Sequence, residues 1–100
     1  MKVRNMTGNT GREVPNQFII TDDENEMSGN AVQYFQSYKT VIAKIDKFRA
    51  GMATRQIWLD HNWDYSKTTG KYRNQFLGET RKETERKIKE GIYIVTDLNS

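Results

Sequence analysis

The chain lacks cysteine, and it contains one proline and one histidine among its 100 residues. The absence of cysteine excludes disulfides and thiolate chemistry, and the single His61 cannot build a histidine-rich metal site by itself. No apolar run approaches the roughly 18 residues that a membrane-spanning helix needs, and residues 1–13 contain no apolar stretch typical of a signal peptide. We therefore expect a soluble cytoplasmic protein that does not bind a membrane.

Apolar side chains are also scarce, because the hydrophobic fraction is 35%. A chain of this length buries only about 60–65% of its unfolded surface, so its core is thin. Two Trp, five Tyr and four Phe residues offset the shortage, since each aromatic side chain buries a large area. These proportions predict a single domain whose core consists of few but large side chains.

The first 60 residues alternate between turn-like and strand-like segments. Residues 1–14 are polar and unpatterned, so we expect a flexible tail there and one folded domain over residues 15–100. Segments rich in β-branched and aromatic residues predict strands at residues 17–21, 31–38, 39–48 and 56–60. In the third of these, Ile42, Ile45 and Phe48 also fall at helical spacing, so a helix is the alternative there.

The last 35 residues predict two short helices and a strand. Ser66 and Thr68 are both suitable caps for a first helix that ends at Gly78. Thr80 and Glu83 have the spacing of a capping box, which predicts a second helix, and residues 92–96 predict a strand. The predicted core residues are Trp63, Tyr72, Phe76 and Leu77. The fold class is therefore α+β: a small antiparallel sheet of about four to five strands with two short C-terminal helices on one face.

The net charge of +3 comes from the second part of the chain. Residues 66–100 hold eight Lys or Arg and five Asp or Glu, whereas residues 1–65 hold eight of each. Such an excess is typical of a surface that meets an acidic partner. A solvated helix face is the alternative, because glutamates are interleaved with the basic residues.

The basic residues lie beside hydroxyls, and both hydroxyls and helix N-terminal amides donate hydrogen bonds to phosphate oxygens. The candidate nucleic-acid-binding residues are Lys67, Thr68, Thr69, Lys71, Arg73, Arg81, Lys82 and Arg86. The same hydroxyls are equally explained as helix caps, and the two roles are compatible. Aromatic residues between positions 58 and 76 are suited to stacking on unpaired bases, but in so small a domain we expect them in the core.

We predict no catalytic residue, metal site or cofactor. Asp60, His61 and Asp64 are close in sequence, but alternation along a strand would place them on different faces, and a metal site needs three or four converging ligands. Asp60 and His61 also lack an accompanying nucleophile or phosphate-binding loop. A polar turn at the end of a strand is the simpler interpretation.

Three motifs stand out: an FQSY-x-T-x-I segment at residues 35–42, a WDYS-x-TT-x-KY-x-x-x-FLG block at residues 63–78, and a looser tail at residues 86–99 that contains I-x-x-G-x-Y and ends in LN. In these motifs the chain resembles a family of small uncharacterised proteins encoded by bacteriophages and prophages. The resemblance implies no activity and no site residue. It implies a protein that acts on the machinery of a host cell.

These features together predict a non-enzymatic phage-type accessory protein, which binds and modulates a host protein or a protein–nucleic-acid complex in the host cytoplasm, as inhibitors of host defence (anti-CRISPR or anti-restriction proteins) do. The alternative is a protein that binds DNA or RNA directly, without sequence preference, through residues 67–89. A protein partner has a candidate surface in an acidic loop that contains Asp22, Asp23, Glu24 and Glu26.

Overall fold

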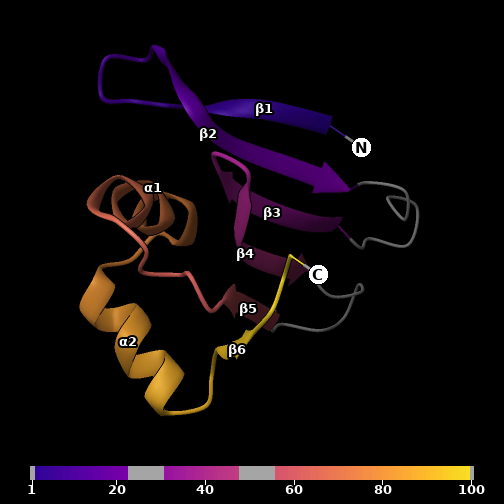
Figure 1. Cartoon of the computed structure of the whole chain (residues 1–100), viewed down its shortest axis with the longest axis vertical. Coiled ribbons are helices and arrows are strands. Elements are labelled where there is room, and N and C mark those ends of the chain that lie inside the picture. The colour runs from indigo at the N-terminus through magenta and orange to yellow at the C-terminus, as the bar shows by residue number, and fades with distance from the viewer. Residues whose placement is uncertain (1, 23–30, 48–55, 100) are drawn as a thin grey trace.

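The computed structural model describes residues 2–22, 31–47 and 56–99, which form a six-stranded sheet and two helices (Figure 1). In chain order the elements are β1 (Lys2–Thr7), β2 (Glu13–Asp22), β3 (Ala31–Ser37), β4 (Thr40–Lys47), β5 (Gln56–Asp60), α1 (Lys67–Leu77), α2 (Arg81–Lys89) and β6 (Ile94–Thr96). The strands lie in the sheet in the same order. Neither helix is long and apolar enough to cross a membrane.

Strands β1 to β5 pair antiparallel with their neighbours, whereas β6 runs parallel to β5. Parallel neighbours require a crossover connection, and α1 and α2 together form it between β5 and β6. The predicted α+β class is confirmed. The described sheet is one strand larger than the four to five expected, and it is mixed instead of purely antiparallel.

The extra strand lies at the N-terminus, where the prediction of a flexible tail is wrong. Met6 of β1 is 1% exposed, and the side chain of Asn5 donates a hydrogen bond to the Val14 carbonyl at 3.0 Å. Gln75 of α1 donates to the Thr7 carbonyl, also at 3.0 Å, so β1 is tied to α1 as well. An edge strand with one buried side chain has no apolar alternation that the sequence could reveal.

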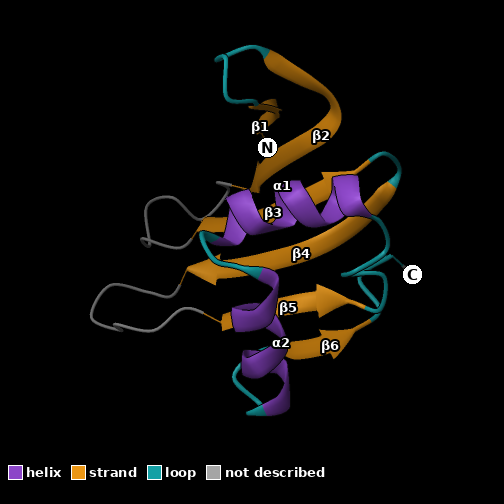
Figure 2. Ribbon diagram, turned by 90° about the vertical axis from the view of Figure 1, so that its left-hand side faces the viewer, coloured by secondary structure: helices purple, strands orange, loops and turns teal. Residues whose placement is uncertain are grey.

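One face of the sheet carries the core. The pairing register places one residue from each of five strands in a row: Ile19, Phe35, Ala43, Leu59 and Val95. Helix α1 crosses in front of β3 on this face (Figure 2), where the Phe76 ring stacks on Phe35 with centroids 5.8 Å apart. Tyr72 and Leu77 are buried, and Trp63 and Phe76 are partly buried against them, so the predicted core residues lie in or against the core.

The opposite face of the sheet carries a different row. Ile20, Tyr34, Lys44, Trp58 and Ile94 are in register across it. The Nζ atom of Lys44 lies 4.9 Å from the Trp58 ring centroid and 5.9 Å from that of Tyr34, so one ammonium group bridges two rings. Both views show α1 and α2 on the other side of the sheet (Figures 1 and 2).

The sequence pattern of residues 39–48 allowed either a strand or a helix, and the structure places strand β4 there. The β3–β4 register shifts between Phe35 and Gln36, which makes Ile42 the extra residue of a β-bulge. Ile42, Ala43 and Ile45 are consequently all buried. The bulge thus gives a strand the apolar spacing of a helix, which is why the sequence pattern was ambiguous. Residue 48 lies outside the described residues.

Candidate functional site

The first turn of α1 is held to the end of β3 by a chain of hydroxyls. Of the two caps that the sequence offers, Ser66 is the N-cap: its Oγ accepts a hydrogen bond from the Thr69 amide and donates one to Thr69 Oγ1, both at 3.1 Å. Thr69 Oγ1 also lies 3.0 Å from Ser37 Oγ. Ser37 and Thr69 are both buried. The contact between their hydroxyls joins β3 to α1, two segments that are distant in sequence.

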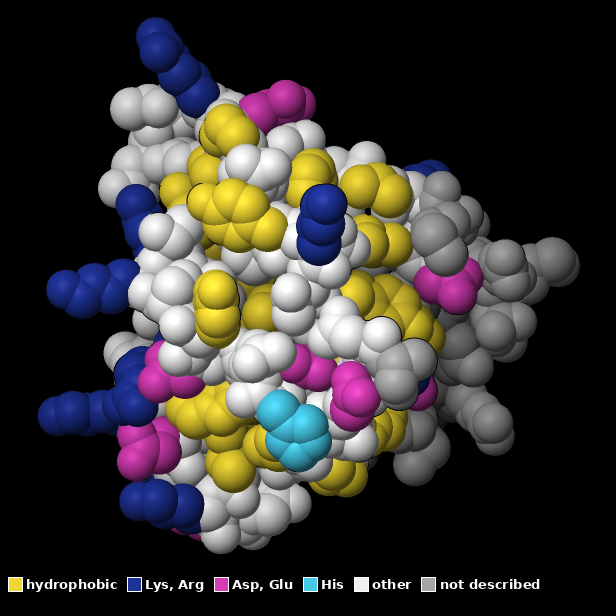
Figure 3. Space-filling view, in the orientation of Figure 1, with side chains coloured by type: hydrophobic (Ala, Val, Ile, Leu, Met, Phe, Trp, Pro, Cys, Tyr) yellow, Lys and Arg dark blue, Asp and Glu magenta, His cyan; other side chains and the backbone are white. Residues whose placement is uncertain are grey.

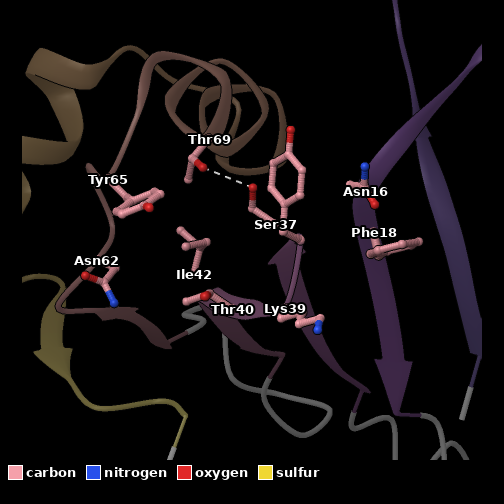
Figure 4. A pocket seen from close by; sticks show the side chains of 10 residues that line it. Asn16, Phe18, Ser37, Lys39, Thr40, Ile42, Asn62, Tyr65 and Thr69 are labelled. Atoms are coloured by element: carbon pink, nitrogen blue, oxygen red, sulfur yellow. Dashed lines mark hydrogen bonds between the residues drawn. The ribbon is translucent and has the colours of Figure 1, made fainter.

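Beside this junction lies a pocket of about 850 Å³, here called the Tyr38–Tyr65 pocket (Figure 4). It is lined by Asn16, Phe18, Ser37, Tyr38, Lys39, Thr40, Ile42, Asn62, Tyr65 and Thr69. Figure 4 shows Asn62 and Tyr65 on one side, Asn16 and Phe18 on the other, and Ile42 between them. A volume of this size lies within the range of pockets that bind small molecules.

The lining of the Tyr38–Tyr65 pocket combines aromatic rings, hydroxyls, amides and one ammonium group, and the described residues contribute no carboxylate to it. Tyr38 is 54% and Tyr65 75% exposed, so both rings are accessible to a ligand. Lys39 supplies a positive charge. Such a lining suits a ligand with a flat ring, hydrogen-bonding groups at the edge of that ring, and a negative charge.

A second hollow, of about 600 Å³ and here called the Lys67–Lys71 groove, is lined by Asp64, Ser66, Lys67, Gly70, Lys71, Arg73, Asn74 and Arg81. The Arg73 guanidinium donates to the Trp63 carbonyl at 2.8 Å, to Asp64 at 3.2 Å and to Asn74 at 2.9 Å. It also lies 5.1 Å from the Trp63 ring centroid. Arg73 therefore holds α1 to the segment before it.

Four of the eight residues predicted to bind nucleic acid are engaged within the protein. Thr69 and Arg73 are each 1% exposed, so a phosphate cannot reach them and the prediction is wrong for both. Their spacing of four residues places both on the inward side of α1. Arg81 and Arg86 are exposed, but each forms ion pairs with nearby carboxylates at 2.7 to 3.1 Å. The hydrogen bond from Arg81 is the main reason that the pKa of Asp64 lies below its usual value.

The other four predicted residues, Lys67, Thr68, Lys71 and Lys82, are exposed. The cations in the ion pairs seen at α1 and α2 are Arg73, Arg81, Arg86, Lys87 and Lys89. Lys67, Lys71 and Lys82 therefore have no carboxylate partner among the described residues. Figure 3 shows Lys and Arg side chains projecting on the side where Figure 1 places the helices. In the acidic loop, Asp22 ends β2, and Asp23, Glu24 and Glu26 lie outside the described residues.

Asp60 has a structural role. Its carboxylate accepts hydrogen bonds from the Asn62 amide at 2.9 Å, the Leu98 amide at 2.8 Å and the Asn99 side chain at 2.9 Å. Burial alone would raise the pKa of Asp60, but these hydrogen bonds outweigh it and lower the pKa. Asn99 also bonds to both backbone groups of Val41, so Asp60 anchors the C-terminal segment. Within the described ranges, no three His, Cys, Asp or Glu residues are grouped so as to hold a metal ion.

Sequence reasoning missed the part of the Tyr38–Tyr65 pocket that β2 and the β3–β4 turn contribute, namely Asn16, Phe18, Tyr38 and Lys39. Two of the sequence motifs, at residues 35–42 and 63–78, meet in this pocket. Each motif was visible, but no local signal showed that they are neighbours, because their contact depends on the sheet order and on the packing of α1.

Residues 1–91 match a family of unknown function (DUF8033), so the chain belongs to that family. No curated protein and no solved structure matches the chain. Membership assigns neither an activity nor a source, and the resemblance to bacteriophage and prophage proteins stays a prediction.

Proposed function

We propose that this protein is a non-enzymatic, phage-type binding protein whose target contains nucleic acid, either free or within a host protein–nucleic-acid complex that it modulates. One observation carries the proposal. Lys67, Lys71 and Lys82 lie near the starts of α1 and α2 and have no carboxylate partner among the described residues. The described lining of the neighbouring Tyr38–Tyr65 pocket contains no carboxylate either.

The remaining basic residues of α2 show why this distribution matters. Arg81, Arg86, Lys87 and Lys89 each have a carboxylate oxygen within 3.4 Å. The charge of a paired lysine or arginine is offset by the neighbouring carboxylate, so its net attraction for a phosphate is weak. An unpaired lysine has no such offset and attracts a phosphate more strongly. The first turn of α1 contains no acidic residue, so its free amides add positive potential at the same place.

The remaining polar groups support binding and not catalysis. Asp60 anchors the C-terminal segment, and Glu79 accepts hydrogen bonds from Thr84, Lys87 and Tyr93 at 2.6 to 2.7 Å. The hydroxyls of Ser37 and Thr69 bond to each other. Within the described ranges, no general base bonds to these hydroxyls, as activation of a nucleophile would require.

The test compares two double variants with the same change in net charge. In Lys67→Gln/Lys71→Gln, the two removed charges are unpaired; in Arg86→Gln/Lys89→Gln, both removed charges are paired with glutamates. Affinity for labelled single-stranded DNA and RNA is measured by fluorescence anisotropy between about 50 and 200 mM salt. The first variant should bind more weakly and reduce the slope of log K against log salt by about 1.4, because it loses two phosphate contacts on a single strand.

The control variant should keep the wild-type slope, and circular dichroism checks that both variants are folded. Wild-type protein that binds neither nucleic acid at the lowest salt would contradict the proposal, as would equal losses in the two variants. Charge reversal at Asp23 and Glu24 should leave binding to nucleic acid unchanged. Contact of that acidic loop with a host protein stays a separate prediction, because both residues lie outside the described part of the chain.

A further inference from the structure

Two residues with a left-handed backbone meet at the Tyr38–Tyr65 pocket. Asn16 and Tyr38, with φ angles of 65° and 57°, are the only non-glycine residues in the described ranges with positive φ. The Tyr38 amide donates a hydrogen bond to the Asn16 carbonyl at 2.7 Å, so each residue fixes the position of the other. A left-handed conformation is uncommon for a bulky residue such as tyrosine, and backbone strain of this kind clusters at binding sites.

Three polar side chains of the pocket have no partner within the described part of the protein. Asn16, Lys39 and Asn62 form no side-chain hydrogen bond or ion pair with another described residue. The side-chain amides of Gln36 and Gln75, by contrast, form hydrogen bonds within the protein. Gln36 donates to the Tyr38 carbonyl at 2.8 Å, and Gln75 donates to the Thr7 carbonyl. The pocket thus presents donors and acceptors that the fold does not need.

Gln17 adds a second unsatisfied group beside the pocket. It lies opposite Ser37 in the β2–β3 register and is 1% exposed. Both polar atoms of its amide lack a partner, which is rare for a buried side chain. The left-handed backbone of Asn16 and the unpaired amide of Gln17 thus lie on adjacent residues at the same end of β2.

We propose that the Tyr38–Tyr65 pocket binds one unpaired nucleobase of a single-stranded nucleic acid, with the neighbouring phosphates at Lys39 and Lys67. This inference rests on the proposed function and specifies the part of the target that is recognised. A base offers a flat ring for the exposed tyrosines and hydrogen-bonding edges for the amides of Asn16 and Asn62. The phosphates match a lining whose described residues include a lysine and no carboxylate.

The pocket therefore distinguishes single strands from duplexes. Bases in a duplex are stacked and paired, so a duplex can reach only the lysines, whereas a single strand can also insert a base. Stacking tolerates every base because each has a flat face. A preference for single strands without a sequence preference follows.

The experiment measures anisotropy with three probes: a mixed-sequence single strand, the same strand with abasic sites, and the duplex. The variant is Tyr65→Ala, because Tyr65 is 75% exposed and outside the core. Its affinity for the intact single strand should fall roughly 5- to 150-fold, the range expected for one lost stack. Affinity for the abasic strand and the duplex should be unchanged, and Tyr65→Phe should restore binding because the ring is kept.

Tyr34→Ala is the matched control, because Tyr34 is an aromatic residue on the opposite face of the sheet. It should bind all three probes as wild type does. If the abasic and intact strands bind equally and Tyr65→Ala has no effect, while Lys67→Gln/Lys71→Gln still weakens binding, the base pocket is refuted and the proposed function stands. If Tyr34→Ala weakens binding in place of Tyr65→Ala, the base lies on the other face and the inference is wrong. If the wild-type protein binds none of the probes, the base pocket and the proposed function are both refuted.

Discussion

Tyr93 offers the sharpest test of the packing between the helices and β6. Its hydroxyl donates a hydrogen bond to Glu79 Oε1 at 2.6 Å, and Lys87 donates to the same oxygen at 2.7 Å. The other carboxylate oxygen accepts from Thr84 at 2.6 Å. Tyr93 is 6% exposed, so solvent does not replace these partners. The proposed perturbation is Tyr93→Phe, which removes the hydroxyl and keeps the ring.

The size of the effect below pH 10 follows from the hydrogen bond, because a hydrogen bond to a charged group contributes about 1.5–3 kcal/mol. Its pH dependence follows from the titration of Tyr93: burial, and then the hydrogen bond to Glu79, raise the pKa of Tyr93 from 10.0 to about 12. At about 1.36 kcal/mol per pKa unit, ionisation of Tyr93 costs the folded protein roughly 3 kcal/mol relative to the neutral side chain. Because the folded pKa is the higher one, the contribution is complete below pH 10 and is lost as pH rises through 12.

The assay is urea unfolding followed by tryptophan fluorescence, at several pH values from 8 to 12. At pH 8, Tyr93→Phe should lower the free energy of unfolding by about 2 kcal/mol. The difference between variant and wild type should then shrink as pH rises from 10 towards 12. Lys87, whose pKa is raised mainly by its hydrogen bond to Glu79, titrates in both proteins and affects them in the same direction. Parallel curves up to pH 12 would refute the hydrogen bond between Tyr93 and Glu79.

Two further predictions concern α1 and α2, and thermal unfolding by circular dichroism measures both. Phe76→Ala should cost about 3 kcal/mol, at the lower end for a phenylalanine, because Phe76 is partly buried and stacks on Phe35; an unchanged Tm would contradict its packing in the core. Thr80→Ala should cost about 1 kcal/mol, because Thr80 and Glu83 form a reciprocal capping box. Thr80→Ser keeps the cap, so an equal cost for both substitutions would argue against the box.

The local features of α1 and α2 could be predicted from the sequence. The Ser66 cap, the Thr80–Glu83 box and the stop at Gly78, whose φ is 72°, all occur as expected. Each depends on hydrogen bonds or backbone angles within about four residues. Such interactions are short-range, so the residue types and their spacing are sufficient to identify them.

The candidate site could be predicted only in part. Lys67, Thr68 and Lys71 are exposed as expected, but Thr69 and Arg73 are buried. Nothing in the composition of this segment separates the two groups. The inward side of α1 is set by what the helix packs against, and its partners Ser37 and Phe35 lie on a distant strand.

By itself, the sequence determined the α+β class, the two capped helices and the basic excess after residue 65, because these follow from local propensity and counted charges. The tertiary structure alone decided that residues 2–7 form an edge strand, that the last strand runs parallel, and that the β3–β4 turn meets the start of α1. These outcomes depend on contacts between residues dozens of positions apart, such as Gln75 with Thr7 and Ser37 with Thr69. These features are stabilised by tertiary packing between distant segments, so no single segment of the sequence specifies them.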